Sequence, residues 1–345
     1  MEQYISLLNE ANRNLGLINE EITPETIGVI QSLTDEQQRA LFNQMVLVAA
    51  QRGHENFFSA EKNDFRDFII DVQNEYGWTI QDYMLEVLEG VTPQWVNGNY
   101  SDTEQAENLV KDYEQKVKET THYKPFRKQF PTTVRDYEYR KSFYPSKLGA
   151  FIDRKIGMMT TSGEIWLKNS VIIDELKQMV TDEDIVVKGG YTVNNKNGIL
   201  TLLEDIATDY EAFSQDNSSY NKDGVISITP YDDLKYIVTK ASIYKRLAVR
   251  EYASAFNLKE MDLKGRIIYV PEDYDLGQAE NGEDILFFVV DRRAIVVAIK
   301  MWRSSSFYVA NQYKTNHWLG IEGVRGHNRF INAVAYTGEP KGNFQ

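Results

Sequence analysis

Histidines, acidic pairs and glycine-rich loops carry much of the metal, acid–base and phosphate chemistry of proteins, and this sequence lacks their usual spacings. None of its four histidines has a second histidine or a carboxylate at the spacing of a zinc-binding helix. The acids at 182–184 are adjacent in sequence, which is typical of a solvated loop. Neither a phosphate loop nor a G-x-S-x-G motif occurs. We therefore expect no catalytic residue, metal or cofactor, and no enzymatic activity.

A basic, aromatic segment at 122–147, HYKPFRKQFPTTVRDYEYRKSFYPSK, is the other candidate for chemistry. Three prolines exclude a long helix and predict an extended arm. Cations interleaved with aromatic rings suit single-stranded nucleic acid, but they also suit the acidic surface of a neighbouring copy. The formal net charge of −13 favours the second interpretation. The candidate contact residues are Arg127, Lys128, Arg135, Arg140 and Lys141.

Composition indicates an ordinary globular protein that associates with other chains. The 345 residues are 42% hydrophobic and 26% charged. Cysteine is absent, which favours a reducing compartment such as the cytoplasm, and the N-terminal residues do not form a signal peptide. The 21 Tyr, 16 Phe and 5 Trp favour extensive interfaces.

The stretch 285–302, ILFFVVDRRAIVVAIKMW, is nearly long and apolar enough to cross a membrane. Three consecutive charges at its centre would cost on the order of 2.5 to 3.5 kcal/mol each, so a membrane span is excluded. The two flanking apolar runs are predicted to be buried strands. Asp291 and Arg292, in the connection between them, are expected to contact a neighbouring subunit.

The remaining elements are predicted from periodicity and capping residues. Helices are expected at 23–52 as two segments, around 65–72, at 80–88, at 163–180 and at 199–213. A strand from Val225 is expected to lead, through Thr229 and Pro230, into a helix ending near Ala241. Short strands follow from Arg266. Because strands and helices do not alternate regularly, an α+β fold is expected.

Several of these motifs occur in a characteristic order: VISITPYDDLKYIVTKAS, GRIIYVP, DILFFVVDRRAIVVAIKMW, SSFYVANQYKTNHWLGIEG and FINAVAYTG. In this order, the region 225–338 resembles the C-terminal half of tailed-bacteriophage major capsid proteins of the Hong Kong-97-type fold, particularly those of short-tailed phages. The resemblance implies a structural protein of the virion that is assembled in the host bacterial cytoplasm.

The resemblance also implies a division of the chain. Residues 1–121 would be an N-terminal arm and helical region, and 122–147 the extended E-loop that reaches over an adjacent subunit. Residues 148–181 would hold the peripheral domain with its long spine helix, and 182–320 the axial domain. Residues 321–345 would return to the peripheral domain and form the C-terminal tail.

Three functions follow as hypotheses. The first is a major capsid subunit that forms pentamers and hexamers of an icosahedral head around double-stranded DNA. Its partners would be further copies, possible scaffolding, portal and decoration proteins, and the packaged DNA, bound weakly and non-specifically. The second is an encapsulin-like nanocompartment shell of the same fold. The third is a single-stranded nucleic-acid-binding protein that uses the segment 122–147.

Overall fold

The computed structural model describes residues 2–23, 25–59, 65–71, 79–85, 95–96, 99–100, 117–138, 148–192, 196–243 and 266–339. The chain divides into two compact units. Unit 1 comprises Met1–Trp78, Tyr123–Gln178 and Ile295–Gly326, and unit 2 comprises Thr79–His122, Met179–Ala294 and His327–Gln345. Among the described residues, no helix is both long and apolar enough to span a membrane.

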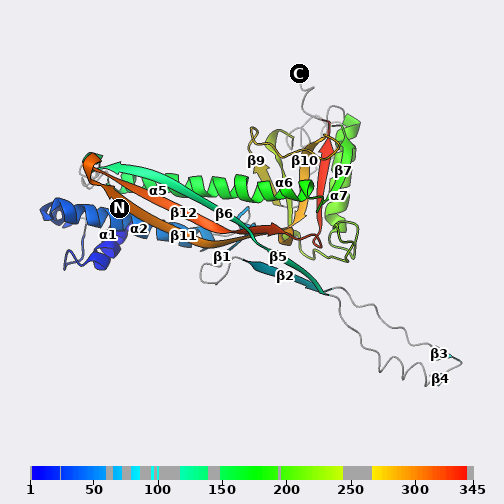
Figure 1. The fold of residues 1–345 in the computed structure, drawn as a ribbon, viewed down its shortest axis with the longest axis horizontal. Coiled ribbons are helices and arrows are strands. Elements are labelled where there is room, and N and C mark those ends of the chain that lie inside the picture. The colour runs from blue at the N-terminus through cyan, green and yellow to red at the C-terminus, as the bar shows by residue number, and fades with distance from the viewer. Residues whose placement is uncertain are drawn as a thin grey trace. The chain divides into compact units, whose positions relative to one another are not determined.

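Unit 1 is built on a four-stranded sheet with the order β1-β11-β12-β6 (Figure 1). The strands are β1 (Ile69–Asp71), β6 (Lys124–Arg135), β11 (Ile295–Val309) and β12 (Lys314–His327). β6 pairs antiparallel with β12 along its whole length, and β1 pairs parallel with β11. Gly323 allows a close approach within this sheet, because a Cβ there would lie 2.1 Å from the carbonyl oxygen of Ala298.

The N-terminal helices belong to unit 1 and pack against its sheet. They are α1 (Glu2–Leu15), the 3-10 helices η1 (Ile27–Ser32) and η2 (Phe65–Phe68), and α2 (Asp35–Ser59). Thr34 caps α2: its backbone N–H donates to Gln37 Oε1 at 3.0 Å, and the Gln37 N–H donates to Thr34 Oγ1 at 3.3 Å. The apolar faces of α1 and α2 form one core cluster with Met159, Val134 and Leu319.

A long helix crosses residues 148–181 in three parts: α5 (Leu148–Trp166), the π-helical segment η3 (Leu167–Ile173) and α6 (Asp174–Thr181). The helix predicted at 163–180 is therefore confirmed, although it begins at Leu148. Arg325 donates to the carbonyl oxygens of Ser170 and Val171 at 3.1 and 3.3 Å, and its Nε lies 3.2 Å from the buried Glu175 carboxylate. Arg325 thus supplies donors to carbonyl oxygens in the irregular part of the helix.

Unit 2 contains a five-stranded sheet with the order β7-β13-β10-β8-β9. The strands are β7 (Val186–Tyr191), β8 (Lys235–Lys240), β9 (Arg266–Val270), β10 (Asp284–Asp291) and β13 (Ala333–Gly338). The central strand β10 is antiparallel to both β13 and β8, and β7 and β9 add to the edges in parallel. Helix α7 (Lys196–Ala212), predicted at 199–213, contributes Leu202 and Ile206 to the core cluster of this sheet, and Phe213, directly after the helix, joins the same cluster.

Unit 2 also contains a two-stranded antiparallel ribbon, β2 (Ile80–Leu85) paired with β5 (Val117–His122). A second short pair, β3 (Trp95–Val96) and β4 (Asn99–Tyr100), lies between them in sequence. The helix predicted at 80–88 is wrong over 80–85, because these residues satisfy their backbone groups with a strand more than thirty positions away. Of the helix predicted around 65–72, residues 65–68 form only the 3-10 helix η2, residues 69–71 form the strand β1, and residue 72 lies outside the described residues.

The predicted helix after Thr229 and Pro230 is also wrong. A single 3-10 turn, η4 (Asp232–Leu234), is followed by strand β8. All six residues of β8 are buried, and the run Tyr236, Ile237, Val238 is aromatic and β-branched, so a strand enclosed on both faces is the better solution. Thr229 and Pro230 are typical of the start of a helix, but the residues after Leu234 form a strand.

The two apolar runs of 285–302 are strands, as predicted, but they belong to different sheets. β10 lies in the unit 2 sheet and β11 in the unit 1 sheet, with the 3-10 turn η5 (Arg292–Ala294) between them. The expectation that both strands form the core of one domain is therefore wrong. The closing strand β13 is confirmed, but it pairs with β10 and β7 in unit 2 and does not join the sheet of unit 1.

Candidate assembly surfaces

Three of the basic residues predicted to contact a neighbour, Arg127, Lys128 and Arg135, are exposed on β6. The Nε atom of Arg127 lies 2.7 Å from Glu322 of the paired strand β12, so this cation is compensated within the chain. Arg140 and Lys141 lie outside the described residues. The described part of the basic segment is the strand β6, paired with β12 over Lys124–Arg135, and not a free arm.

The prolines of this segment exclude a long helix, as predicted. Pro125 and Pro131 lie within the strand β6, which is at an edge of its sheet. A proline is tolerated on an edge strand when its missing N–H would have pointed away from the neighbouring strand. Proline and charged residues also protect such an edge from pairing with a foreign strand.

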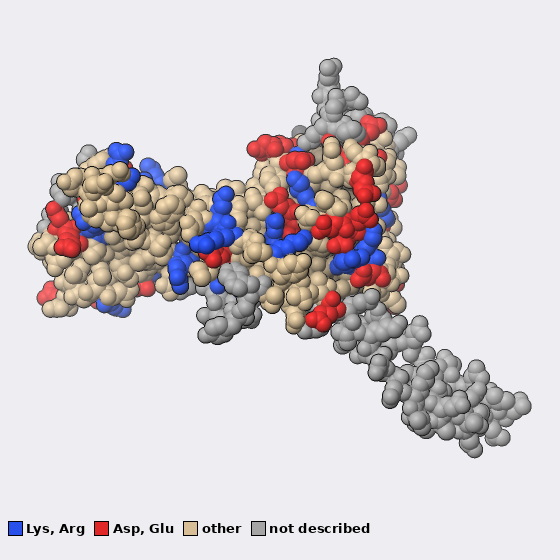
Figure 2. All heavy atoms as spheres, in the orientation of Figure 1, with Lys and Arg blue, Asp and Glu red and all other residues tan. Residues whose placement is uncertain are grey.

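The described surface drawn in Figure 2 carries charges of both signs. On the face drawn in Figure 2, Lys and Arg groups are interspersed with Asp and Glu groups. Nucleic-acid grooves instead gather positive charge along a stripe that follows the phosphate backbone. The described part of that face carries no such stripe.

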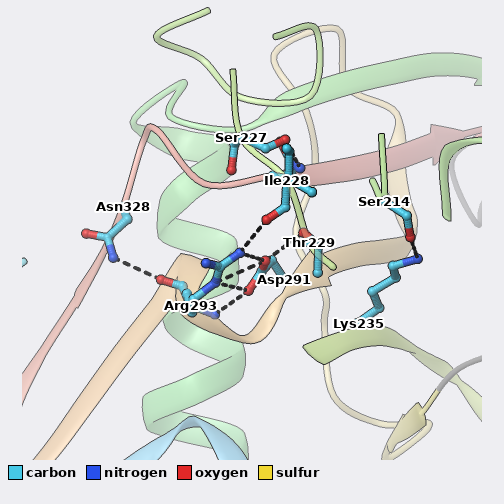
Figure 3. Close-up of polar contacts among 9 residues, drawn as sticks. Ser214, Ser227, Ile228, Thr229, Lys235, Asp291, Arg293 and Asn328 are labelled. Atoms are coloured by element: carbon cyan, nitrogen blue, oxygen red, sulfur yellow. Dashed lines mark hydrogen bonds and ion pairs between the residues drawn. The ribbon is translucent and has the colours of Figure 1, made fainter. Parts of the chain in front are cut away.

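The turn between β10 and β11 contains the other predicted contact residues, Asp291 and Arg292. Asp291 is fully buried: its Oδ2 accepts the Thr229 hydroxyl at 2.6 Å, and its Oδ1 accepts the backbone N–H of Arg293 at 2.8 Å (Figure 3). The Arg293 guanidinium lies 2.6 Å from Oδ2, and this pairing with Asp291 raises the pKa of Arg293. Asp291 therefore shapes the turn from inside, whereas Arg292 is exposed.

A buried polar cluster in unit 2 was missed by the sequence analysis. The Asp209 carboxylate on α7 accepts bonds from Lys188 Nζ at 2.6 and 2.8 Å and from the Tyr220 hydroxyl at 3.0 Å, and it also accepts the Tyr336 hydroxyl. Burial, followed by the bond to Asp209, raises the pKa of Tyr220 to about 12. The cluster ties α7 to strands β7 and β13. A single Asp on an otherwise apolar helical face was the one available signal.

Asp182, Asp184 and His327 offer ligand atoms within 4.8 Å of one another, a spacing that a metal ion could use. One Asp184 oxygen lies 2.9 Å from His327 Nε2, and the other lies 3.1 Å from Arg329 Nε. Since a guanidinium already neutralises the central carboxylate, the arrangement fits an internal ion-pair network better than a cation site.

Comparison with known proteins identifies the family. The profile of the family described as Phi29-like phage major capsid protein matches residues 30–337, most of the chain. The chain belongs to this family. The description of this family names a structural component of the phage capsid.

Two relatives place this capsid protein more closely. It is 26% identical over 269 residues to the major capsid protein of Bacillus phage GA-1, a match that covers 76% of this chain and 53% of that protein. The chain thus spans about half the length of that curated relative. It is also similar to a chain in the capsid structure of Staphylococcus phage Andhra, with a TM-score of 0.55, 14% identity, and coverage of 81% of this chain and 85% of that chain.

The likeness to the Andhra capsid chain concerns the fold. A chain from a structure of native bacteriophage P68, determined with its head fiber and inner core protein, has a TM-score of 0.49 and 13% identity, over 79% of this chain and 84% of that one. The predicted α+β class and the likeness to Hong Kong-97-type phage capsid proteins are confirmed at this level.

Proposed function

We propose that this capsid protein assembles with its own copies into pentamers and hexamers, which form the icosahedral head around the double-stranded DNA genome. The family match over residues 30–337 is the observation that carries this proposal. A closed shell needs large surfaces that recognise other copies of the same chain, and no catalytic constellation. The aromatic-rich composition suits such surfaces.

Within this proposal, unit 1 is the peripheral domain and unit 2 the axial domain. The helix α5–η3–α6 is the spine helix, and the sheet β1-β11-β12-β6 accompanies it in the peripheral domain. The axial domain is then the sheet β7-β13-β10-β8-β9 with α7. This assignment moves β11 and the first half of β12 into the peripheral domain and β13 into the axial domain, compared with the boundaries expected from sequence.

The E-loop, in this proposal, is the ribbon of β2 and β5 together with the residues between them. The two strands pair with each other, and among the described strands neither joins a larger sheet. An isolated two-stranded ribbon is marginally stable in water, so it gains from contact with a further surface. The surface of an adjacent subunit is the partner that a shell provides. Lys128 and Arg135, exposed on β6, are the basic residues best placed for inter-subunit contacts.

The other two hypotheses are less well supported. A nanocompartment shell would share the fold, but the matching family consists of phage capsid proteins. The hypothesis of single-stranded nucleic-acid binding relied on a basic arm that is free to reach the nucleic acid. Residues 124–135 are instead paired residue by residue with β12. Scaffolding, portal and decoration proteins stay proposed partners of the shell, and DNA a weak and non-specific one.

The proposal is tested by expressing the chain with the head genes of its phage and imaging the product by electron microscopy. Closed particles are expected, and a product of monomers alone contradicts shell formation. In a second arm, residues 86–116 are replaced by a short Gly/Ser linker that keeps β2 and β5 paired. Loss of particles with an unchanged circular dichroism spectrum supports the E-loop assignment, and a normal particle yield contradicts it.

A further inference from the structure

Buried and exposed side chains alternate along residues 225–230 of unit 2. Val225, Ser227 and Thr229 are buried, whereas Ile226 and Ile228 are 41% and 39% exposed. Tyr231, just beyond them, is 66% exposed. Period-two alternation directs every second side chain of an extended segment to the same side. Here the outward side carries the β-branched apolar residues Ile226 and Ile228, and the exposed Tyr231 follows them in sequence.

The backbone of this segment is held from several directions, as Figure 3 shows in part. The Thr229 N–H donates to the Phe213 carbonyl at 2.7 Å, and the Ser227 carbonyl accepts the Asn332 side chain at 3.0 Å. The Arg293 guanidinium donates to the Ile228 carbonyl at 2.9 Å. The outward side chains are therefore presented on a fixed backbone, which lowers the entropy that binding would cost.

The same network places cations beside the apolar residues. Asp291, buried beneath the turn, binds both the backbone N–H and the guanidinium of Arg293. The guanidinium of Arg293 in turn contacts the Ile228 carbonyl, so the turn η5 adjoins the segment. Arg292 and Arg293 are both exposed. An apolar centre with Tyr and Arg nearby has the composition of protein interfaces and not of an ordinary solvated surface.

The charge of this surface indicates what it binds. The loop 271–283 of the same unit, PEDYDLGQAENGE, contains five acids and neither Lys nor Arg. Asp273 in this loop is exposed. Subunits that form a ring contact each other head to tail, so two different surfaces of the chain meet at each interface. The arginine-bearing surface of one copy and the acidic loop of the next copy have opposite charges, as two surfaces that meet head to tail should have.

We propose that the surface formed by Ile226, Ile228, Tyr231 and Arg292 docks on the acidic loop 271–283 of a second copy of this chain. The proposal rests on the self-assembly proposed above, and it names one pair of surfaces through which that assembly occurs. Asp291 is a positioning residue in this arrangement: it fixes the turn that bears Arg292 and does not itself touch the neighbour.

The test uses substitutions at exposed positions, so that folding is preserved. Ile228→Asp and Arg292→Glu are each expressed in the full chain, and particle yield is measured by sedimentation and electron microscopy. Each is expected to lower the yield at least tenfold while leaving the thermal unfolding midpoint of the soluble chain unchanged. Val187→Asp is the matched control, because Val187 is 41% exposed on β7 of the same unit. It should assemble normally.

Charge exchange tests the acidic partner. Asp273→Lys alone should also reduce assembly, and Asp273→Lys combined with Arg292→Glu should restore it. Wild-type yields from both Ile228→Asp and Arg292→Glu would overturn the surface, and loss without restoration in the double variant would overturn the acidic loop as its counterpart. If the unaltered chain forms no particles, shell formation itself fails, and that result is distinct from either outcome.

Discussion

His317 on β12 gives unit 1 a defined sensitivity to acid. Its side chain is fully buried against the ring of Phe42 of α2, and neither ring nitrogen has a hydrogen-bond partner among the described residues. Burial, with a smaller contribution from the nearby Lys155, lowers the pKa of His317 from 6.5 to about 4. The imidazole is therefore neutral in the folded chain at neutral pH.

The sign and size of the effect follow from linkage. Well above pH 6.5 the imidazole is neutral in both the folded and the unfolded chain, so it adds no pH dependence to the free energy of unfolding. Between pH 6.5 and 4 the unfolded chain takes up a proton that the folded chain does not, and the free energy of unfolding falls by roughly 1.4 kcal/mol per pH unit. Over the whole interval the loss is about 3 kcal/mol.

The assay is urea unfolding of the soluble chain followed by tryptophan fluorescence between pH 7.5 and 4. Carboxylates contribute their own pH dependence, so the wild-type chain is compared with His317→Leu. The difference in unfolding free energy between the two should change by about 3 kcal/mol across the interval, in favour of the variant at low pH. Thr315→Val, a buried neighbour on the same strand without a titratable group, should follow the wild type. Parallel pH profiles for wild type and His317→Leu would refute the reasoning.

Three further predictions concern stability. Asp209→Ala should destabilise unit 2 by about 3 to 5 kcal/mol, because it leaves Lys188 and two tyrosine hydroxyls without their acceptor; a loss below 1 kcal/mol in urea unfolding would contradict this. Gly323→Ala should prevent normal packing of β12 and lower the melting temperature, since its Cβ would overlap the Ala298 carbonyl; an unchanged melting temperature would show that the strands can separate. Arg325→Met should raise amide hydrogen exchange within Leu167–Ile173 at least tenfold relative to α7, because it removes the donor to two carbonyls and one of the cations beside the buried Glu175 carboxylate; equal exchange would contradict the role of Arg325.

The sequence predicted the elements whose information is local. Thr34 with Gln37 marks the start of α2, and the periodicity of 199–213 gives α7. The charges at 291–293 correctly separated two strands. Elements formed by distant pairing were not predictable in this way: Ile80–Leu85 has a periodicity compatible with a helix, and only its partner strand Val117–His122 makes it a ribbon.

The candidate surfaces show the same limit. The basic residues at 127, 128 and 135 could be recognised as candidates from their charge alone. That they lie on a strand paired with β12 could not be predicted, because it depends on residues distant in sequence. The adjacent Asp291 and Arg292 appeared equivalent in sequence, whereas one is buried and the other exposed. Burial of a single charged side chain depends on residues such as Thr229, which lies 62 positions away, and no local pattern reports it.

Cryo-electron microscopy of the assembled particles tests the central claim most directly. A reconstruction that resolves neighbouring subunits should show a closed icosahedral shell of pentamers and hexamers, with the β2–β5 ribbon lying on an adjacent copy. A shell in which this ribbon touches only its own chain, or a preparation in which the folded chain forms no shell, would contradict the account.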